Sequence, residues 1–177
     1  MKLKYCKNEI KKVLISEKQI NSKIKELAKK ITKDYENKDL VVICVLRGSI
    51  MFVCDLIRKI DLPLEVDFFW VKSYQEMDTT GTVKILKKPD SVLKNRDILL
   101  IDDILDTGHT FAKLVEEIQK YQPKSLKIAA FLDKPSRRIV EVKLDYCGFV
   151  VPNEFVVGYG LDFNQKYRNL PYIGVLK

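Results

Sequence analysis

The sequence predicts an α/β fold in which a mostly parallel central sheet is flanked by helices. Short apolar runs alternate along the chain with segments whose apolar residues recur at helical spacing. The strongest runs are continuously apolar, which is typical of parallel strands covered on both faces. Alternation of strands and helices gives right-handed crossovers, and it places helices on both sides of the sheet.

Length and composition favour a single domain spanning residues 1–177. A chain of 177 residues can bury a substantial core, and 46% of its residues are hydrophobic. No apolar run is long enough to span a membrane, and Met1 is not followed by the apolar segment of a signal peptide. We therefore expect a cytoplasmic protein that has no membrane partner.

The cysteines indicate neither a metal site nor a disulfide framework. Cys6, Cys44, Cys54 and Cys147 lack the spacing of metal ligands. Cys44 and Cys54 lie in apolar patterns, so we predict that both are buried, free thiols in a reducing compartment.

The first element is predicted to be an amphipathic helix. Ser16 and Gln19 have the spacing of a capping box, and Ile15 and Ile20 are placed for a hydrophobic staple. An apolar stripe at helical spacing follows, formed by Ile20, Ile24, Leu27, Ile31 and Tyr35.

The positive charge of the chain is concentrated in this segment. Residues 1–38 contain 12 lysines and five acidic residues, and so they carry +7 of the net charge of +8. A nucleic-acid-binding surface would explain this excess, but few aromatic residues interleave the lysines. We expect a solvated helix face instead, and no nucleic-acid partner.

The other predicted strands follow in order. They lie at residues 40–46, 65–72, 98–102 and 126–132, with shorter strands near residues 147–150 and 155–157.

Two further helices and one long loop complete the expected layout. A helix over residues 50–60 would face inward through Ile50, Val53, Cys54 and Ile57. A second helix covers residues 110–121. Residues 73–82 are polar and lack an apolar period, so they are expected to form a loop that leads into a hairpin arm at residues 83–86.

The stretch ILLIDDILDTGHTF, residues 98–111, contains the densest set of reactive side chains. Its apolar run ends in Asp102 and Asp103, at the edge where ligands bind in open α/β sheets. Side chains alternate faces along a strand, so we expect these carboxylates to have different roles unless the chain already turns there. A third carboxylate, Asp106, follows. Carboxylates beside an anion site indicate Mg²⁺, which takes one or two of them together with substrate oxygens.

A phosphate cradle is predicted directly after these carboxylates. Thr107, Gly108, His109 and Thr110 lead into a helix, whose first turn has free N–H groups and a dipole that favours anions. Gly108 permits a positive φ or a close backbone approach. The single glycine and the missing lysine distinguish this loop from the GxxxxGK[ST] phosphate loop.

Five segments together resemble one family of enzymes. Residues 98–111 are similar to the phosphoribosyl-pyrophosphate (PRPP) motif of the type I phosphoribosyltransferases. Four others resemble segments of its hypoxanthine-guanine phosphoribosyltransferases, namely the pyrophosphate loop, the mobile loop, the purine-contact segment and the C-terminal hood. They are, in that order, CVLRGS (44–49), SYQEMDTTGTVKI (73–85), LDKPSRR (132–138) and VPNEFVVGYGLDFNQKYRNLP (151–171).

The resemblance implies the type I phosphoribosyltransferase fold, with a small hood formed largely by residues 134–177. It also implies a role in purine salvage, in which the phosphoribosyl group of PRPP is transferred to hypoxanthine or guanine. The products would be IMP or GMP and pyrophosphate. Mg²⁺ would be the cofactor, and the family's dimers and tetramers lead us to expect a homodimer or homotetramer.

Around the central stretch, the resemblance implies that Asp102 and Asp103 bind the ribose and the metal. Asp106 would accept the proton from purine N7 as the general base, and the loop at residues 107–110 would hold the 5′-phosphate. His109 is expected to face outward and to have no catalytic role.

The resemblance also assigns a pyrophosphate site. Arg47, Gly48 and Arg168 would bind the leaving group, and many members have lysine at the position of Arg47. The family usually forms a cis peptide bond between the positions of Leu46 and Arg47.

A purine site and a lid are implied in the same way. Lys134 would contact the exocyclic oxygen of a 6-oxopurine, Phe155 would stack on the base, and Val156 would bind it through its backbone. Asp162 would also belong to the purine site, and it would be a second-site metal ligand near the pyrophosphate. Two further residues, Ser73 and Tyr74, would open a lid that excludes water, and Arg138 would lie near the site without a defined role.

Two other interpretations remain open from the sequence. The chain could be a phosphoribosyltransferase for xanthine, a pyrimidine or adenine, although Lys134 with Phe155 and Val156 favours a 6-oxopurine. It could also be a regulatory RNA-binding relative, which would require the basic excess to line one concave face.

Overall fold

The computed structural model describes residues 9–74 and 82–177, and a six-stranded sheet forms its centre. The strand order is β4-β3-β2-β5-β6-β7. The strands are β2 (Leu40–Leu46), β3 (Glu65–Tyr74), β4 (Thr82–Lys87), β5 (Asp97–Leu105), β6 (Ser125–Asp133) and β7 (Tyr146–Val150). Neighbouring strands are parallel except for the β3–β4 hairpin, so the predicted α/β fold with a mostly parallel sheet is confirmed.

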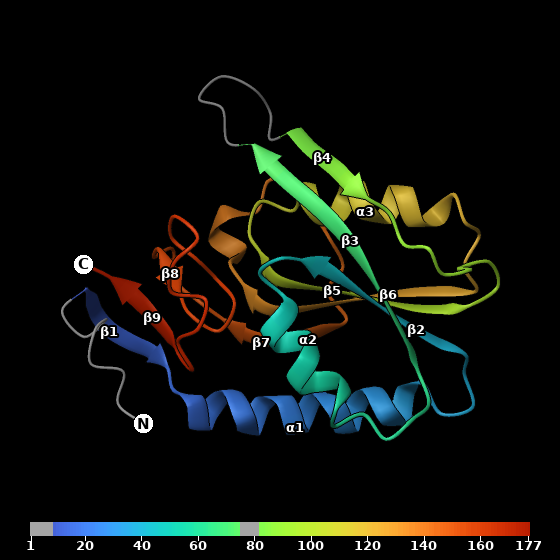
Figure 1. The fold of residues 1–177 in the computed structure, drawn as a ribbon, viewed down its shortest axis with the longest axis horizontal. Coiled ribbons are helices and arrows are strands. Elements are labelled where there is room, and N and C mark those ends of the chain that lie inside the picture. Colours follow the sequence, from blue (N-terminus) through green and yellow to red (C-terminus); the bar gives the residue numbers. More distant parts are fainter. Residues whose placement is uncertain (1–8, 75–81) are drawn as a thin grey trace.

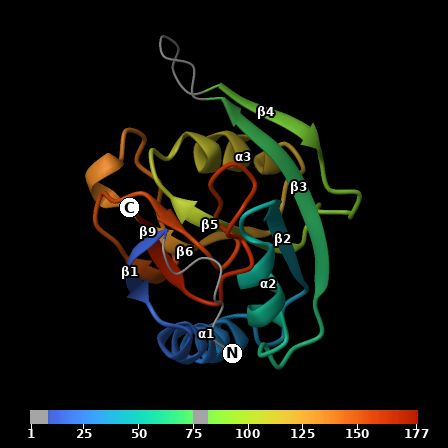
Figure 2. The same cartoon turned by 60° about the vertical axis from the view of Figure 1, so that its left-hand side comes forward.

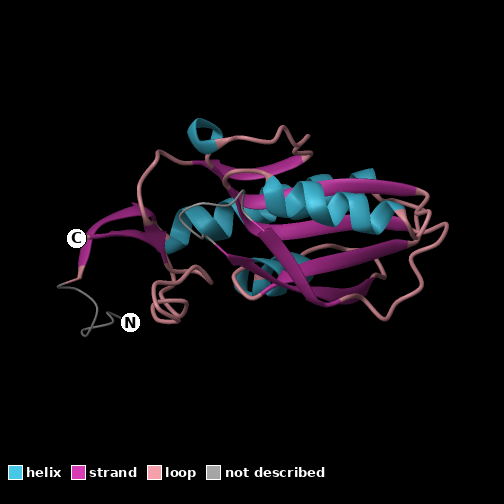
Figure 3. Ribbon diagram, turned by 90° about the horizontal axis from the view of Figure 1, so that it is seen from above, coloured by secondary structure: helices cyan, strands magenta, loops and turns pink. Residues whose placement is uncertain are grey.

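Helices cover both faces of this sheet, as Figures 1 and 3 show. Helices α1 (Glu17–Asp34) and α2 (Ile50–Ile57) pack on one face, and α3 (His109–Gln119) packs on the other. The alternating side chains of β2 divide between two hydrophobic clusters, because Val42 and Cys44 face α1 and α2 while Val41 and Ile43 face α3. No helix in the described residues is long and apolar enough to cross a membrane.

The first predicted helix is confirmed in detail. The side chain of Ser16 accepts a hydrogen bond from the backbone N–H of Gln19, and the side chain of Gln19 accepts one from the backbone N–H of Ser16. This capping box satisfies two N–H groups at the start of α1. All five members of the predicted apolar stripe are buried.

The predicted orientation of the second helix was wrong in part, because Val53 is buried and Ile57 packs against the core, but Ile50 and Cys54 do not. Its buried residues are Phe52, Val53 and Leu56, whereas Ile50 is 38% exposed and Cys54 is also exposed. The helix is apolar on most sides, so periodicity alone does not select the packed face; contacts with the sheet and α1 select it. The helix also ends at Ile57, three residues early. Cys44 is buried as predicted, and burial raises the pKa of its thiol to about 12.

Two strands extend further than predicted. Strand β5 continues to Leu105 because its pairing with β6 runs on to Leu105 and Asp133, so Asp102 lies within the strand. Strand β3 continues to Tyr74, which pairs with Thr82, so the residues predicted to open the loop end the strand instead. The hairpin arm is confirmed as β4, and residues 75–81 of the predicted loop lie outside the described residues.

A second, three-stranded antiparallel sheet has the order β1-β9-β8. We call this sheet, together with residues 151–172 that lead into and connect β8 and β9, the hood. Its strands are β1 (Ile10–Ile15), β8 (Val156–Val157) and β9 (Ile173–Leu176). It lies at the end of the main sheet toward which the parallel strands point (Figures 1 and 2). Strands β1 and β9 were not predicted, because each forms its hydrogen bonds with a segment at the far end of the chain. A short 3₁₀ helix (Pro135–Arg137) follows β6.

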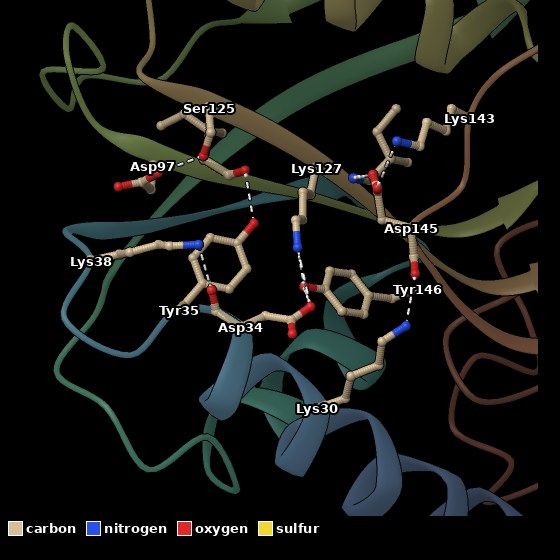
Figure 4. Close-up of polar contacts among 12 residues, drawn as sticks. Lys30, Asp34, Tyr35, Lys38, Asp97, Ser125, Lys127, Lys143, Asp145 and Tyr146 are labelled. Atoms are coloured by element: carbon tan, nitrogen blue, oxygen red, sulfur yellow. Dashed lines mark hydrogen bonds and ion pairs between the residues drawn. The ribbon is translucent and has the colours of Figure 1, made fainter.

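The amino edge of the main sheet is closed by a polar network that Figure 4 shows. The Tyr146 hydroxyl donates to Asp34 Oδ2 at 2.7 Å, and Lys127 Nζ lies 3.1 Å from the same oxygen. Lys127 Nζ also lies over the rings of Tyr35 and Tyr146, 5.6 and 5.4 Å from their centroids. The Tyr35 hydroxyl donates to the carbonyl of Ile98 at 3.3 Å. These contacts tie the end of α1 to β5, β6 and β7.

Candidate active site

The predicted site segments meet at the carboxyl edge of the main sheet. Strands β2, β5 and β6 are parallel neighbours, so the segments that follow Leu46, Leu105 and Asp133 emerge on the same edge. The hood lies across this edge (Figure 2). A backbone contact joins the two parts, because a Cβ on Gly160 of the hood would overlap the carbonyl oxygen of Gly48.

Asp102 and Asp103 form a pair of carboxyl groups, of which the first is buried and the second is half-buried. Only 7% of Asp102 is exposed, and burial together with the neighbouring Asp103 raises its pKa well above the usual value. Burial also raises the pKa of Asp103, while the positive charge of Arg168 acts in the opposite direction. One oxygen of Asp102 accepts the backbone N–H of Asp103 at 2.8 Å. The two carboxyl groups therefore interact even though the strand alternates its side chains.

Gly48 allows the Asp103 carboxylate to approach the backbone after β2. A Cβ at this position would overlap the Asp103 side chain, so only glycine fits without a rearrangement. The peptide bond between Leu46 and Arg47 is cis, as the resemblance implied. The loop after β2 is thereby packed directly against the acidic pair on β5.

The loop after β5 begins α3 through a glycine in a left-handed conformation. Gly108 has φ of 94° and is the N-cap of α3. A Cβ there would overlap the carbonyl of Val140. The first turn of α3 leaves backbone N–H groups without intrahelical partners, which is the property that suits it to an anion. His109 is the first residue of the helix and is half-buried, as are Thr107 and Thr110.

Arg138, in the segment that follows β6, holds this loop through hydrogen bonds to its backbone. Its Nε donates to the carbonyl of Asp106 at 3.0 Å, one terminal nitrogen donates to that of Leu105 at 3.2 Å, and the same nitrogen pairs with Asp133. The backbone N–H groups of residues 139 and 140 both donate to the carbonyl of Thr107 at 2.9 Å. The structure therefore gives Arg138 the positioning role that the sequence left undefined.

Asp106 lies between two basic side chains. Its Oδ1 is 2.9 Å from Nε of Arg137, an ion pair that lacks hydrogen-bond alignment. The charge of Asp106 also acts on Lys134. Within the described residues, the buried Oδ1 atom therefore has no hydrogen-bond donor.

Lys134 is a buried cation beside the hood. Only 7% of the residue is exposed, and its Nζ donates to the carbonyl of Glu154 at 2.7 Å. Burial lowers the pKa of Lys134, and the negative charge of Asp106 opposes that shift. Phe155, which follows Glu154 in the sequence, is 57% exposed and makes an edge-to-face contact with Phe163, with 5.6 Å between the ring centroids. Val156 is buried in β8. An ammonium group and an exposed aromatic pair therefore border the same hood segment.

A third group of side chains joins the loop after β2 to the hood. Arg168 donates to the carbonyl of Gly160 at 2.6 Å and lies 2.7 Å from Asp162 Oδ1. Arg47 and Arg168 both donate to Oε1 of Gln165, at 3.2 and 3.0 Å. Asp162 therefore lies beside Arg168, as expected of residues that share one subsite.

The carboxylates at this edge fit a bound Mg²⁺ ion. The described residues contain no group of three or more His, Cys, Asp or Glu side chains that could hold a metal. Mg²⁺ does not require one, because it is usually bound by one or two carboxylates with substrate oxygens and water. Asp102 and Asp103 are adjacent carboxyl groups that supply hard oxygen donors, and the backbone N–H of Asp103 holds one oxygen of Asp102.

Most of the predicted site residues lie along this one edge, but three neighbours were missed. Arg137 contacts Asp106, Gln165 bridges two arginines, and Phe163 packs on Phe155. Arg137, Phe163 and Gln165 all lie inside the motif segments 132–138 and 151–171, but nothing in their residue type or spacing indicated a role. Of the predicted lid, the backbone of Ser73 and Tyr74 belongs to β3, and the segment beyond lies outside the described residues.

Comparison with known proteins agrees with this geometry. The model of the phosphoribosyl transferase domain family matches residues 15–164. The chain is 50% identical over 172 residues to a hypoxanthine-guanine phosphoribosyltransferase of Bacillus subtilis, covering 97% of this chain and 96% of that protein. It is 49% identical over 171 residues to the bifunctional protein TilS/HprT of Listeria monocytogenes, covering 96% of this chain but only 26% of the longer protein.

A solved structure shares the whole fold. The crystal structure of a hypoxanthine phosphoribosyltransferase from Staphylococcus aureus matches with a TM-score of 0.95 and 45% sequence identity, covering 100% of this chain and 97% of that one. The family model spans more than half of the chain, and the relatives of similar length align from end to end. The chain therefore belongs to the phosphoribosyl transferase family and has the type I phosphoribosyltransferase fold.

Proposed function

We propose that the protein is a purine salvage enzyme that transfers the 5-phosphoribosyl group of PRPP to hypoxanthine or guanine. N9 of the base attacks C1 of the ribose, the bond from C1 to pyrophosphate breaks, and IMP or GMP forms. The observation that carries this choice of base is the buried ammonium of Lys134 beside the exposed ring of Phe155. The names of the relatives of similar length support the same assignment.

Lys134 is proposed to recognise the 6-oxo group of the purine. An ammonium has only donors, so it pairs with an exocyclic oxygen and rejects the amino group that adenine presents there. Phe155 would stack on the base, and Val156 would bind it through its backbone. The hydrogen bond that Lys134 now makes to the Glu154 carbonyl holds the ammonium next to this segment of the hood.

Asp106 is proposed to be the general base that accepts the N7 proton while N9 forms its new bond. Its buried Oδ1 atom, which lacks a hydrogen-bond donor in the described part of the chain, supports this role because an acceptor remains available. General base catalysis of this kind contributes about 10²- to 10⁴-fold to a rate. Arg137 would have to yield its contact with Asp106 when the purine enters.

The remaining residues are proposed to hold PRPP in position for the displacement. The loop formed by Thr107, Gly108, His109 and Thr110 binds the 5′-phosphate, largely through the first turn of α3. Asp102 and Asp103 bind the ribose hydroxyls and the metal. Bound Mg²⁺ would neutralise charge on the pyrophosphate and the ribose oxygens.

The leaving pyrophosphate is proposed to be held by Arg47, Gly48 and Arg168, with Asp162 as a ligand of a second metal ion. Cations at this position stabilise the charge that develops as the bond to C1 breaks. Ser73 and Tyr74 would begin a lid that excludes water from the ribosyl centre.

Self-association and a cytoplasmic location belong to the same proposal. We propose a homodimer or homotetramer. The exposed apolar residues Ile50 and Met51 support this, because Met51 also lines a groove of about 660 Å³ that a second copy could cover. Analytical ultracentrifugation of the full chain tests the assembly.

The free cysteines in the described residues are compatible with the proposed location in a reducing compartment.

The substrate assignment is tested with a panel of hypoxanthine, guanine, xanthine and adenine, each supplied with PRPP and Mg²⁺. We expect turnover of hypoxanthine or guanine and none of adenine. Turnover of adenine alone would overturn the role of Lys134. Turnover of xanthine or a pyrimidine in preference to both expected bases would favour the alternative of a phosphoribosyltransferase for another base.

A further inference from the structure

Two guanidinium groups from distant parts of the chain converge on one neutral oxygen. Arg47 follows β2 and Arg168 belongs to the hood, yet both donate to Oε1 of Gln165, at 3.2 and 3.0 Å. These two arginines are the ones proposed to bind the pyrophosphate. Gln165 is the residue that physically joins them.

The backbone around Gln165 is held in a specific turn. Its N–H donates to Asp162 Oδ2 at 2.9 Å, and a pair of backbone hydrogen bonds closes the turn between Phe163 and Lys166. Asn164 and Gln165 have φ values of 51° and 63°, a left-handed conformation that costs free energy in residues other than glycine. The turn therefore fixes the direction in which the carboxamide extends.

The arginines differ in how many other partners hold them. Arg168 is also fixed by the carbonyl of Gly160 and the carboxylate of Asp162. Arg47 lies 5.3 Å from the centroid of the Trp70 ring. Within residues 9–74 and 82–177, the one hydrogen bond of the Arg47 side chain is the bond to Gln165. Loss of the carboxamide would therefore release Arg47 more than Arg168.

A carboxamide suits this position because it orders two cations without cancelling their charge. Two guanidinium groups on one acceptor repel each other, and an anion at the same position would relieve that repulsion by neutralising them. The amide oxygen accepts from both groups but is neutral. The positive charge of Arg47 therefore remains available to a ligand with two phosphates, whereas Arg168 also pairs with Asp162.

We propose that Gln165 is a positioning residue that preorganises Arg47 and Arg168 for the diphosphate group of PRPP and for released pyrophosphate. This inference rests on the proposed function of the site. Gln165 does not touch the reacting carbon; it acts through the two arginines. Its contribution should therefore appear in the binding of the diphosphate and leave binding of the purine unchanged.

The test compares two exposed glutamines that share the same backbone conformation. Gln165→Leu removes the acceptor, and Gln122→Leu is the matched control, because Gln122 has φ of 55° but lies in the turn between α3 and β6. The measurements are the Kd of pyrophosphate with Mg²⁺ by calorimetry, the KM values for PRPP and hypoxanthine, and kcat.

We expect Gln165→Leu to raise the Kd of pyrophosphate and the KM for PRPP roughly tenfold, the effect of losing a hydrogen bond to a charged group. The KM for hypoxanthine should stay within twofold of wild type, as should all constants of Gln122→Leu. Gln165→Asn shortens the side chain by one methylene and tolerates the left-handed backbone well, so it should show the same loss without a folding defect.

A double-mutant cycle identifies the route of the effect. In an Arg47→Met background, Gln165→Leu should raise the Kd of pyrophosphate by clearly less than in the wild type, because one of its two partners is already gone. Equal effects in both backgrounds would overturn a route through Arg47. An equal loss in Gln122→Leu, or wild-type constants in both Gln165 variants, would overturn the inference altogether.

The outcome separates this inference from the function on which it rests. A wild-type protein that neither binds pyrophosphate nor uses PRPP would refute the proposed function. A wild-type protein that does both, alongside Gln165 variants with unchanged constants, would refute the positioning role alone.

Discussion

At the carboxyl edge of the main sheet a buried carboxyl group lies beside a half-buried one, whereas at the amino edge a half-buried carboxylate lies among hydrogen-bonding and charged partners. Burial raises the pKa of Asp102 and of Asp103, and the neighbouring Asp103 raises that of Asp102 further. Asp34 accepts a hydrogen bond from Tyr146 and pairs with Lys127, and these partners lower its pKa. Residues of the same chemical class thus have opposite environments at the two ends of one sheet.

The different environments of these carboxyl groups indicate that the amino edge stabilises the fold and that the carboxyl edge binds the ligand. The network in Figure 4 ties the end of α1 to three strands, and its donors and acceptors match. At the carboxyl edge, glycines at positions 48, 108 and 160 bring backbone and carboxylates into contact that any side chain would prevent. Close backbone contacts and neighbouring like charges of this kind gather at functional sites.

The largest effect expected from this comparison is on turnover. Asp106→Asn should lower kcat by about 10²- to 10⁴-fold, because an amide cannot accept the N7 proton, while its size and its contacts with the loop are retained. The Kd for IMP and the thermal midpoint should change little. Unchanged turnover would refute the assignment of Asp106 as the base, and the corresponding change at the amino edge, Asp34→Asn, is the matched control.

The second expected effect has opposite signs for activity and stability. Asp102→Asn should raise the free energy of unfolding by about 1 kcal/mol in the absence of Mg²⁺ and PRPP, because it removes one of two neighbouring charges. Its oxygen can still accept the N–H of Asp103. Activity should fall at the same time. Urea unfolding and steady-state kinetics measure the two quantities, and a loss of stability would contradict the view that the pair is a cost to the fold.

Local patterns in the sequence indicated one half of the proposed site, whereas most of the non-local half came from the resemblance to known enzymes. Residues 98–111 hold a strand, three carboxylates and a phosphate loop in consecutive positions, so their arrangement follows from local geometry. The contacts of Arg47 with Gln165, or of β1 with β9, join residues more than 100 positions apart, and no periodicity encodes such a pairing. The resemblance to known enzymes supplied Lys134 and Arg168, whose residue types alone indicate only solvated cations.

The same reasoning explains the error at α2 and the fact that the amino-edge network was not predicted. Ile50 and Cys54 are exposed because an apolar helix can present several faces, and only the tertiary contacts decide between them. Asp34, Lys127 and Tyr146 come from three separated elements, and each is unremarkable by itself. A polar network of this kind can be recognised only in the folded structure, where its members come into contact.

The third expected effect tests the amino edge. Lys127→Met should lower the free energy of unfolding by about 1–2 kcal/mol, since it removes an ion pair and a cation held over two rings. Tyr146→Phe, which removes one hydroxyl, should cost about 1 kcal/mol. The KM values for PRPP and hypoxanthine should not change in either variant. A rise in either KM would show that the two edges are coupled, and it would contradict the view that the amino edge serves stability alone.

The smallest effect is a change of stability with pH that depends on Asp34. The hydrogen bond from Tyr146 is the main cause that lowers the pKa of this carboxylate in the folded state. A lowered pKa means that the unfolded chain binds more protons, so the stability that Asp34 contributes is present above its unfolded value of about 3.9 and is lost as the pH falls through the lowered folded value. Unfolding curves of the wild type and Asp34→Asn at pH 7, 5, 4 and 3 should therefore differ by a constant amount from pH 7 to 5 and then converge. A difference that persists unchanged to pH 3 would mean that the ionised carboxylate is not what secures the end of α1.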